Sequence, residues 1–224
     1  MIEVKNLSKS FGRHEVLTDI NLDVKAGEVT AIVGENGAGK STFFKCLAGL
    51  EKHKGSIDLG AELSKNKIGF LPTNPEFLSK ITAQEYLQFI CNARGVQVDH
   101  IRSKNLFDLP MNRYASEFST GMKKKLALTA LLLVENDLFI LDEPFNGLDL
   151  QSNILFFEIL ERLKAKGKTV ILSSHIFNSI HETADYLFYL KDGKIAAKGS
   201  KEKFSEIEEL IKSSVIEGKL DGLI

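Results

Sequence analysis

The sequence predicts one α/β domain, built on a parallel sheet that helices cover on both faces, with two smaller parts attached to it. In the second half, helical patterns alternate with the short apolar runs 138–141 and 169–173, which lack the polar alternation of a half-exposed strand. Such runs are typical of parallel strands buried on both faces. Residues 2–33 instead hold short β-like runs (2–4, 20–24 and 29–33) separated by turn residues, which is typical of strands and hairpins, and we expect a small antiparallel β lobe near the N-terminus.

The second small part is a helical insert between about residues 72 and 120. The stretch 75–114 shows no strand pattern, and within 83–93 the apolar residues Tyr86, Leu87 and Ile90 recur at helical spacing. We therefore expect a short helical lobe that interrupts the sheet.

The C-terminal region is predicted to form an amphipathic helix over about residues 201–213. Phe204, Ile207, Leu210 and Ile211 recur at helical spacing among charged residues. This helix is either a packing element or a regulatory arm, and we expect packing.

Bulk composition excludes several classes of protein. Lys and Arg total 29 against 30 Asp and Glu, so the net charge of -1 gives no general attraction to nucleic acid or to anionic lipid. The longest apolar run, 130–134, is far shorter than the about 18 to 20 residues that cross a bilayer. The first residues lack the pattern of a secretory signal, so we expect a cytosolic protein. Cys46 and Cys91 are expected to be reduced and buried.

Residues 34–41, GENGAGKS, fit the phosphate-binding pattern GxxxxGK[ST] and directly follow the run 29–33. The glycines let backbone N–H groups turn toward phosphate oxygens, and the helix that begins near Lys40 adds its partial positive end. Lys40 is expected to neutralise β- and γ-phosphate charge, and Ser41 to ligate Mg²⁺. The candidate nucleotide-binding residues of this segment are Gly34, Asn36, Gly37, Gly39, Lys40, Ser41 and Thr42.

An apolar run, 138–141, ends in two adjacent carboxylates, Asp142 and Glu143. Two carboxylates at the end of a buried strand are costly unless a cation or a reaction uses their charge. Successive side chains at a strand end point in different directions. We therefore expect Asp142 to hold Mg²⁺, and Glu143 to face the γ-phosphate and polarise the attacking water.

Many classes of enzyme use such a phosphate-binding loop, and the segments downstream of it indicate which class this sequence resembles. Residues 118–122, FSTGM, precede a helical run, 146–149, NGLD, follow the acidic pair, and His175 ends the segment 172–175, LSSH. This order of motifs resembles the nucleotide-binding domain of ABC transporters over nearly the whole chain. The resemblance implies a single ATP-binding domain over residues 1–224, with a P-loop (RecA-like) core, an N-terminal antiparallel β subdomain and a short helical subdomain.

The same resemblance implies further roles. Phe11 stacks on adenine, and His175 contacts the γ-phosphate and orients Glu143. Ser119 and Gly121, in what we call the signature segment (118–122), form a second phosphate clamp at a helix start. In the family that clamp acts on the nucleotide of another subunit.

The resemblance therefore implies an ATP-dependent dimer, formed by two copies or with a different ABC subunit. The chain would bind ATP and Mg²⁺, hydrolyse ATP and drive a separate membrane-spanning permease from the cytoplasmic face of the membrane, without binding nucleic acid. The form Ser-x-Gly-Met-Lys of the signature segment resembles the exporter branch.

Three positions depart from the commonest form of the family. Thr120 and Met122 replace a glycine and a glutamine, and Thr73 stands where a glutamine reports the γ-phosphate and Mg²⁺ to the membrane partner. Hydrolysis is expected to survive the change at Thr73, while coupling through its loop is altered. The lysine run 123–125 is expected to be a solvated helix face.

Three other classes of protein fit this sequence less well. An ABC ATPase that acts on ribosomes or DNA is the main alternative, but such proteins commonly carry two cassettes or a long coiled-coil insertion. A P-loop kinase or GTPase would lack the signature segment and His175, and residues 66–69, NKIG, do not match the base-reading motif of a GTPase. A module that binds ATP without turnover would not need Glu143.

Overall fold

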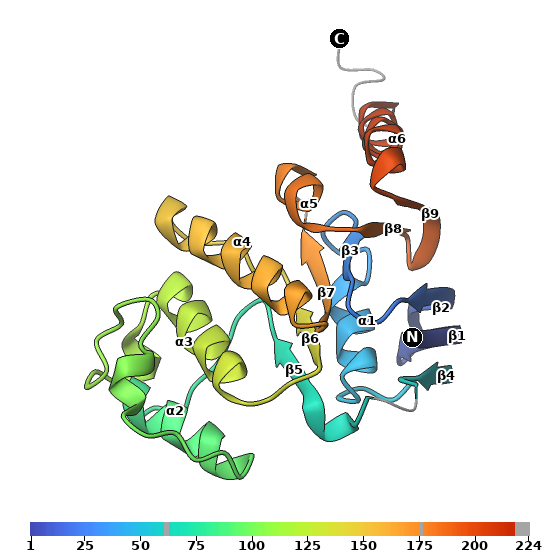
Figure 1. The fold of residues 1–224 in the computed structure, drawn as a ribbon. Coiled ribbons are helices and arrows are strands. Elements are labelled where there is room, and N and C mark those ends of the chain that lie inside the picture. Colours follow the sequence, from blue (N-terminus) through green and yellow to red (C-terminus); the bar gives the residue numbers. More distant parts are fainter. Residues whose placement is uncertain (61–62, 175–176, 218–224) are drawn as a thin grey trace.

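The computed structural model describes residues 1–60, 63–174 and 177–217, and it contains two β-sheets with helices packed around them (Figure 1). The larger sheet has six strands in the order β5-β6-β7-β3-β8-β9. Its strands are β3 (Val29–Val33), β5 (Ile68–Leu71), β6 (Leu138–Leu141), β7 (Thr169–Ser174), β8 (Tyr186–Lys191) and β9 (Lys194–Ser200). The helices are α1 (Lys40–Leu47), α2 (Ala83–Ala93), α3 (Thr120–Leu133), α4 (Leu150–Ala165), α5 (Phe177–Thr183) and α6 (Phe204–Glu217).

The predicted parallel sheet is confirmed. Strands β5, β6, β7, β3 and β8 pair in parallel, and β9 adds an antiparallel edge. Every residue of β3, β6 and β7 is buried, as the apolar runs without polar alternation indicated.

The two faces of this sheet contribute to two separate cores. Ile32, Ile140 and Ile171 face α1, where they pack with Phe43, Phe44 and residues of the N-terminal strands. The opposite face packs against α4 and α5, and against the part of α6 that carries Phe204. Helix α1 therefore lies between the two sheets (Figure 1). Its N-terminus lies near the carboxyl end of β3 because only the short loop 34–39 joins the two elements.

The N-terminal lobe is a three-stranded antiparallel sheet, in the order β2-β1-β4, formed by β1 (Ile2–Phe11), β2 (His14–Val24) and β4 (Lys54–Asp58). Strands β1 and β2 are longer than the runs 2–4 and 20–24 that the sequence predicts. Polar residues such as Ser10 keep their ladder pairing although they are exposed, because pairing uses the backbone and not the side chain.

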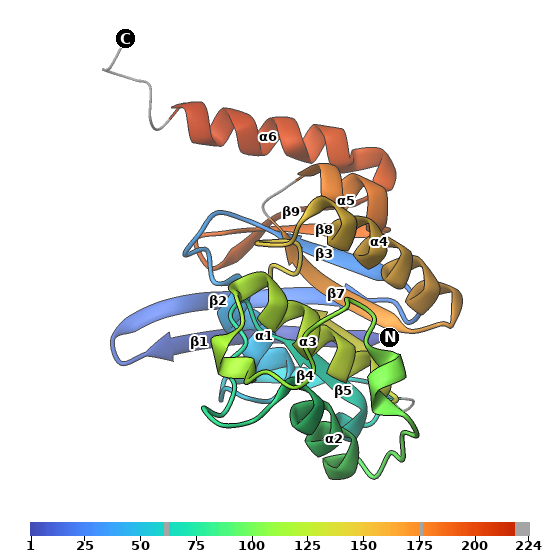
Figure 2. The ribbon, with the colours of Figure 1, turned by 90° about the vertical axis from the view of Figure 1, so that its left-hand side faces the viewer.

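Residues 72–120 fold into α2, short helical turns and the start of α3. Helix α2 begins with a capping box, in which the Glu85 amide donates to the Thr82 hydroxyl (3.2 Å) and the Thr82 amide donates to the Glu85 carboxylate (2.8 Å). Leu87 and Cys91 of α2 pack against Leu126 and Ala130 of α3 in a third core. This lobe lies at the opposite end of the molecule from α6 (Figure 2).

Helix α6 spans Phe204–Glu217, later than the predicted range 201–213, because residues 201–203 form a tighter 3₁₀ turn. Phe204 and Ile207 are buried, whereas Leu210 is 48% exposed. His181 of α5 lies 3.4 Å from the Glu208 carboxylate of α6. Within the described ranges, no helix combines the length and the apolar character that crossing a membrane requires.

Candidate active site

The phosphate-binding loop runs from the end of β3 to the start of α1, as the sequence predicts. Gly39 has a φ of 107°, which disfavours any other residue, and a Cβ there would lie 2.7 Å from Leu17. At Gly34 an added Cβ would lie 2.3 Å from the Leu190 carbonyl oxygen, so the loop packs directly on β8. Glycine at these two positions is therefore required by the path of the chain.

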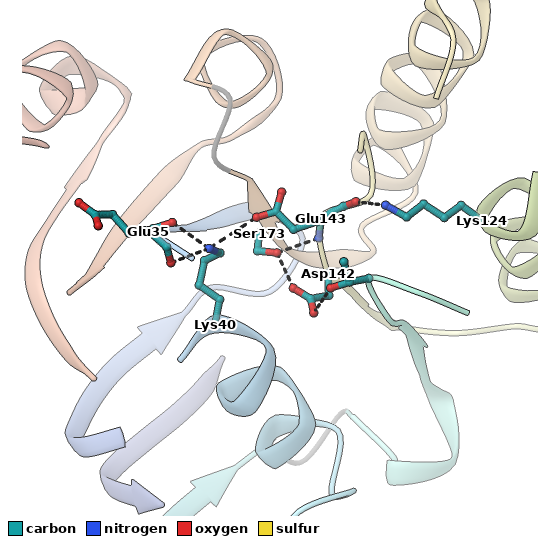
Figure 3. A network of polar contacts seen from close by, with 8 residues as sticks. Glu35, Lys40, Lys124, Asp142, Glu143 and Ser173 are labelled. Carbon is teal, nitrogen blue, oxygen red and sulfur yellow. Dashed lines mark hydrogen bonds and ion pairs between the residues drawn. The ribbon is translucent and has the colours of Figure 1, made fainter. Parts of the chain in front are cut away.

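Lys40, the first residue of α1, is almost fully buried in this loop. Its Nζ donates to the carbonyl oxygens of Gly34 (2.8 Å) and Glu35 (3.1 Å). The same Nζ lies 3.5 Å from Oε1 of Glu143. The lysine therefore connects the loop to the acidic pair at the end of β6 (Figure 3).

The two carboxylates differ in their surroundings. Asp142 is 2% exposed, and its carboxylate accepts hydrogen bonds from the hydroxyls of Ser173 (2.7 Å) and Thr73 (2.6 Å). Glu143 has a φ of 49°, a left-handed conformation that is uncommon for this residue type, and its amide donates to Ser173 Oγ (2.8 Å). Ser173 thus holds both residues of the pair (Figure 3).

A cavity of about 470 Å³ lies between the loop and the acidic pair. Val16, Thr73 and Asn146 contribute to its lining together with Glu143. The loop and the start of α1 contribute Asn36, Gly37, Gly39, Lys40, Ser41 and Thr42. Six of the seven predicted loop residues and Glu143 therefore meet at one site, while Gly34 supports the loop from behind.

Phe11 and the signature segment lie outside the lining of this cavity, as far as the structure describes the chain. Phe11 is 48% exposed, and the Lys9 ammonium lies 4.5 Å from the centroid of its ring. Ser119 is exposed and caps α3, where the Met122 amide donates to its Oγ (3.3 Å). An added Cβ at Gly121 would lie 2.4 Å from the Gly147 carbonyl oxygen. His175 falls outside the described residues.

The prediction of a solvated lysine face at 123–125 is wrong for Lys124. This residue is 2% exposed, and its Nζ donates to the carbonyl oxygens of Glu143 (2.5 Å) and Asn146 (2.7 Å). Lys125 pairs with Asp149 (2.6 Å). A run of like charges indicated solvent, but the start of α3 packs on the loop that follows β6.

Sequence reasoning also left Ser173 and Thr73 out of the candidate site. Strands β6 and β7 are parallel and Leu141 is paired with Leu172, so the next residues, Asp142 and Ser173, become neighbours. The alignment of the two apolar runs could have indicated this contact. Thr73 stood out in the sequence only as a departure from a family pattern.

Comparison with known proteins agrees with the geometry. The sequence profile described as ABC transporter matches residues 17–146, more than half of the chain, including Lys40 and the acidic pair. The chain belongs to the ABC transporter family.

Its relatives in that family include the lantibiotic transport ATP-binding protein SrtF of Streptococcus pyogenes, which is 33% identical over 96% of this chain and 98% of its own. The ABC transporter ATP-binding protein NatA of Bacillus subtilis is 32% identical over 87% of this chain and 85% of its own. The family and these relatives make this chain an ABC transporter ATP-binding subunit.

Solved structures of ATP-binding cassettes share the fold of this ABC transporter subunit. An ATP-binding subunit of an ABC transporter superposes with a TM-score of 0.80, at 30% identity over 94% of both chains. A dimeric ATP-binding cassette in a post-hydrolysis state, bound to ADP and Pi, has a TM-score of 0.79 at 23% identity, over 90% of this chain and 99% of its own. The second likeness is one of fold alone.

Proposed function

We propose that this subunit hydrolyses ATP with Mg²⁺ and uses the reaction to drive export through a separate membrane-spanning subunit. The observation that carries the proposal is the position of Lys40, whose ammonium lies between the phosphate-binding loop and Glu143 in one cavity. A buried lysine beside a glycine loop supplies charge for phosphate, and Glu143, which lines the same cavity, supplies a base.

The residues of the cavity suit Mg²⁺. This ion takes oxygen ligands and is commonly held by one or two carboxylates, phosphate oxygens and water. Ser41 supplies a hydroxyl to the cavity lining, and Asp142 is a buried carboxylate at its edge, held in place by Ser173 and Thr73. Ser41 and Asp142 would hold the ion, which when bound neutralises charge on the phosphate oxygens.

In phosphoryl transfer, some side chains of this subunit would bind the nucleotide and others would take part in the chemical step. Phe11 would stack on adenine with the ring face that Lys9 does not cover. Asn36 and the loop glycines would bind the phosphates, while Lys40 exchanges its present carbonyl acceptors for β- and γ-oxygens. Glu143 would take up a proton from the attacking water, and His175 would contact the γ-phosphate. Catalysis would come from positioning and charge neutralisation.

The position of Ser119 supports a dimer. Ser119 is exposed and lies away from the cavity of its own chain, so its donors are available to a nucleotide held by a second subunit. Two copies, or this chain and a different ABC subunit, would enclose two ATP molecules, and hydrolysis would reopen the pair. The dimeric cassette of the same fold is consistent with this arrangement.

Transport and its direction are supported by the relatives. SrtF, at 33% identity, is a lantibiotic transport protein, which favours an exporter. The motor would sit on the cytoplasmic face of the membrane through its permease, and nucleic acid is not a partner.

Phosphate release by the purified chain, with ATP and Mg²⁺, tests the enzymatic part. We expect turnover that EDTA abolishes and excess Mg²⁺ restores. Co-purification with the membrane protein encoded by the neighbouring gene, followed by ATP-dependent transport in vesicles, tests the motor role. A chain that binds ATP but releases no phosphate, alone or with that membrane protein, would contradict the proposal.

A further inference from the structure

Lys124 is a buried charge that the proposed chemistry does not use. Its side chain is 2% exposed, and its ammonium makes short hydrogen bonds to the carbonyl oxygens of Glu143 and Asn146. Burial lowers the pKa of Lys124, while the nearby carboxylates of Glu143 and Asp142 raise it. Placing an ammonium in such a site is costly unless its hydrogen bonds are made, so these contacts have to be accurate.

The backbone that Lys124 contacts is the one that carries the proposed base. Glu143 has a left-handed φ of 49°, a conformation that surrounding contacts must maintain in a residue with a long side chain. Its amide is anchored to Ser173 of β7, and its carbonyl oxygen is anchored to Lys124 of α3. The two peptide groups of Glu143 are thus held from opposite sides, and they fix the point from which the carboxylate extends (Figure 3).

The same face of α3 touches the rest of this loop. Gly121 approaches the Gly147 carbonyl so closely that an added Cβ would lie 2.4 Å from it, and Lys125 pairs with Asp149 at 2.6 Å. Positions 121, 124 and 125 are three and four residues apart and share one side of a helix. The first turns of α3 and the loop 143–149 are therefore held together at three places.

This face belongs to the helix that begins with the signature segment. We propose that Lys124 is a positioning residue, which holds the main chain of Glu143 in register with the signature helix α3. The inference rests on the proposed function, in which Ser119 and Gly121 act on the nucleotide of a second subunit. A shift of α3 at the nucleotide of the second subunit would then be transmitted through Lys124 to Glu143, whose carboxylate acts on the nucleotide bound by its own chain.

Lys124→Met removes the donor and keeps most of the length and the apolar stem. We expect kcat for ATP hydrolysis to fall about 10²-fold, the loss typical of a reacting group displaced by about 1 Å. KM for ATP should stay within about twofold, because the phosphate-binding loop and Phe11 are untouched. Lys123→Met is the matched control from the same turn, and its kcat should stay within about twofold of wild type.

A double-mutant cycle separates positioning from a general loss of stability. If Lys124 acts through Glu143, Lys124→Met should reduce the residual turnover of Glu143→Gln by less than about twofold. An equal fold-loss in both backgrounds would overturn the inference, as would a Lys124→Met enzyme with wild-type kcat. If Lys124→Met does not fold, Lys124→Gln, which keeps a donor at reduced reach, enters the same cycle with a smaller expected loss.

Hydrogen exchange gives a second measure that needs no turnover. In nucleotide-free protein, Lys124→Met should speed exchange of the amides in 143–149, and Lys123→Met should not. Unchanged exchange would overturn the inference even in an active enzyme. A wild-type chain that releases no phosphate would instead contradict the proposed function, and the exchange result would still decide whether Lys124 positions Glu143.

Discussion

The hydroxyl of Thr73 donates a 2.6 Å hydrogen bond to the carboxylate of Asp142, which joins the loop after β5 to the end of β6. Thr73 also lines the cavity that contains Lys40 and Glu143. The sequence alone linked this position to coupling with a membrane partner. Through its contact with the proposed Mg²⁺ ligand, Thr73 also lies in the proposed chemical site.

Thr73→Val tests that part, because valine keeps the shape and loses the hydroxyl. A buried acceptor that loses one partner is destabilised by about 1–3 kcal/mol. We expect the Mg²⁺ concentration for half-maximal ATP hydrolysis to rise and the rate at saturation to fall, whereas Thr73→Ser stays close to wild type. Phosphate release measured across a Mg²⁺ titration is sufficient. Identical titrations for the valine variant and wild type would remove Thr73 from the site.

Lys40→Ala should abolish detectable ATP binding and hydrolysis while the chain stays folded. The ammonium of Lys40 contacts loop carbonyls and Glu143, where it supplies charge and contributes little packing. Calorimetric titration with ATP measures binding, and a thermal melt reports folding. Lys45→Ala, on an exposed position of the same helix, is the control and should bind ATP normally. Phosphate release by Lys40→Ala at nearly the wild-type rate would contradict the assignment.

Glu143→Gln should separate binding from chemistry. Glutamine keeps the size of the side chain and cannot take up the proton, so turnover should fall by about 10² or more while ATP still binds. The trapped ATP complex should accumulate as a dimer, and ADP should not support it. Size-exclusion chromatography with light scattering measures this directly.

The Ser119→Arg change in that background tests the clamp between subunits. Arginine at the start of α3 would block the signature segment of one chain and leave its own cavity unaltered, because Ser119 lies outside the lining. We expect monomers that still bind ATP. If Glu143→Gln alone remains monomeric at millimolar ATP, pairing of two identical copies is wrong for this chain and a different subunit is required.

Asp149 should contribute a pH-dependent share of stability. The Lys125 ammonium and then the amide and hydroxyl of Ser152 hold the pKa of Asp149 well below its usual range. A lowered pKa means that the ionised form of Asp149 stabilises the fold fully at pH values above about 4. This contribution decreases progressively as the pH falls from about 4 toward the lowered pKa. Asp149→Asn, which retains a cap, should therefore have a lower Tm than wild type at pH 7, and the difference should shrink progressively as the pH falls from about 4 toward the lowered pKa of Asp149.

Asp149→Ala removes both the cap of α4 and the charge, so its Tm at pH 7 should be lower than that of Asp149→Asn. The capping part should persist at low pH, because an alanine side chain offers no acceptor at any pH. High salt should reduce the difference between wild type and Asp149→Asn, since the pair with Lys125 is largely exposed on the Asp149 side. If the Tm difference between wild type and Asp149→Asn changes with neither pH nor salt, the charge of Asp149 does not contribute to stability.

The sequence was sufficient for the features that depend on local pattern. The glycine loop predicted where α1 begins, and the unbroken apolar runs predicted buried parallel strands such as β6. The first feature depends on backbone sterics and the second on burial, and each requires only a few consecutive residues to be recognised.

Contacts between distant segments were not predictable in the same way. Ser173 contacts Asp142 because of the register between β6 and β7. Neither the run 138–141 nor the run 169–173, taken by itself, indicates that register. Three adjacent lysines predict a solvated helix face, but α3 is covered on several sides and buries Lys124. Whether a charged residue on a helix is buried depends on the loop that packs against it. For Lys124 this loop includes Asn146, which is 22 residues away in the sequence.

The strand order has a consequence for how the protein is made. Strand β3 lies in the middle of the larger sheet, where Val29 pairs with Val170 on one side and Thr30 pairs with Tyr186 on the other. During synthesis the glycine loop leaves the ribosome well before both strands that flank β3, because β7 and β8 follow it along the chain. Long-range parallel pairing is slow to form because loop closure precedes the contacts that stabilise it. Nascent chains that end before β8 therefore expose an unpaired edge of the apolar strand β3, and a working cavity can arise only after β8 has emerged.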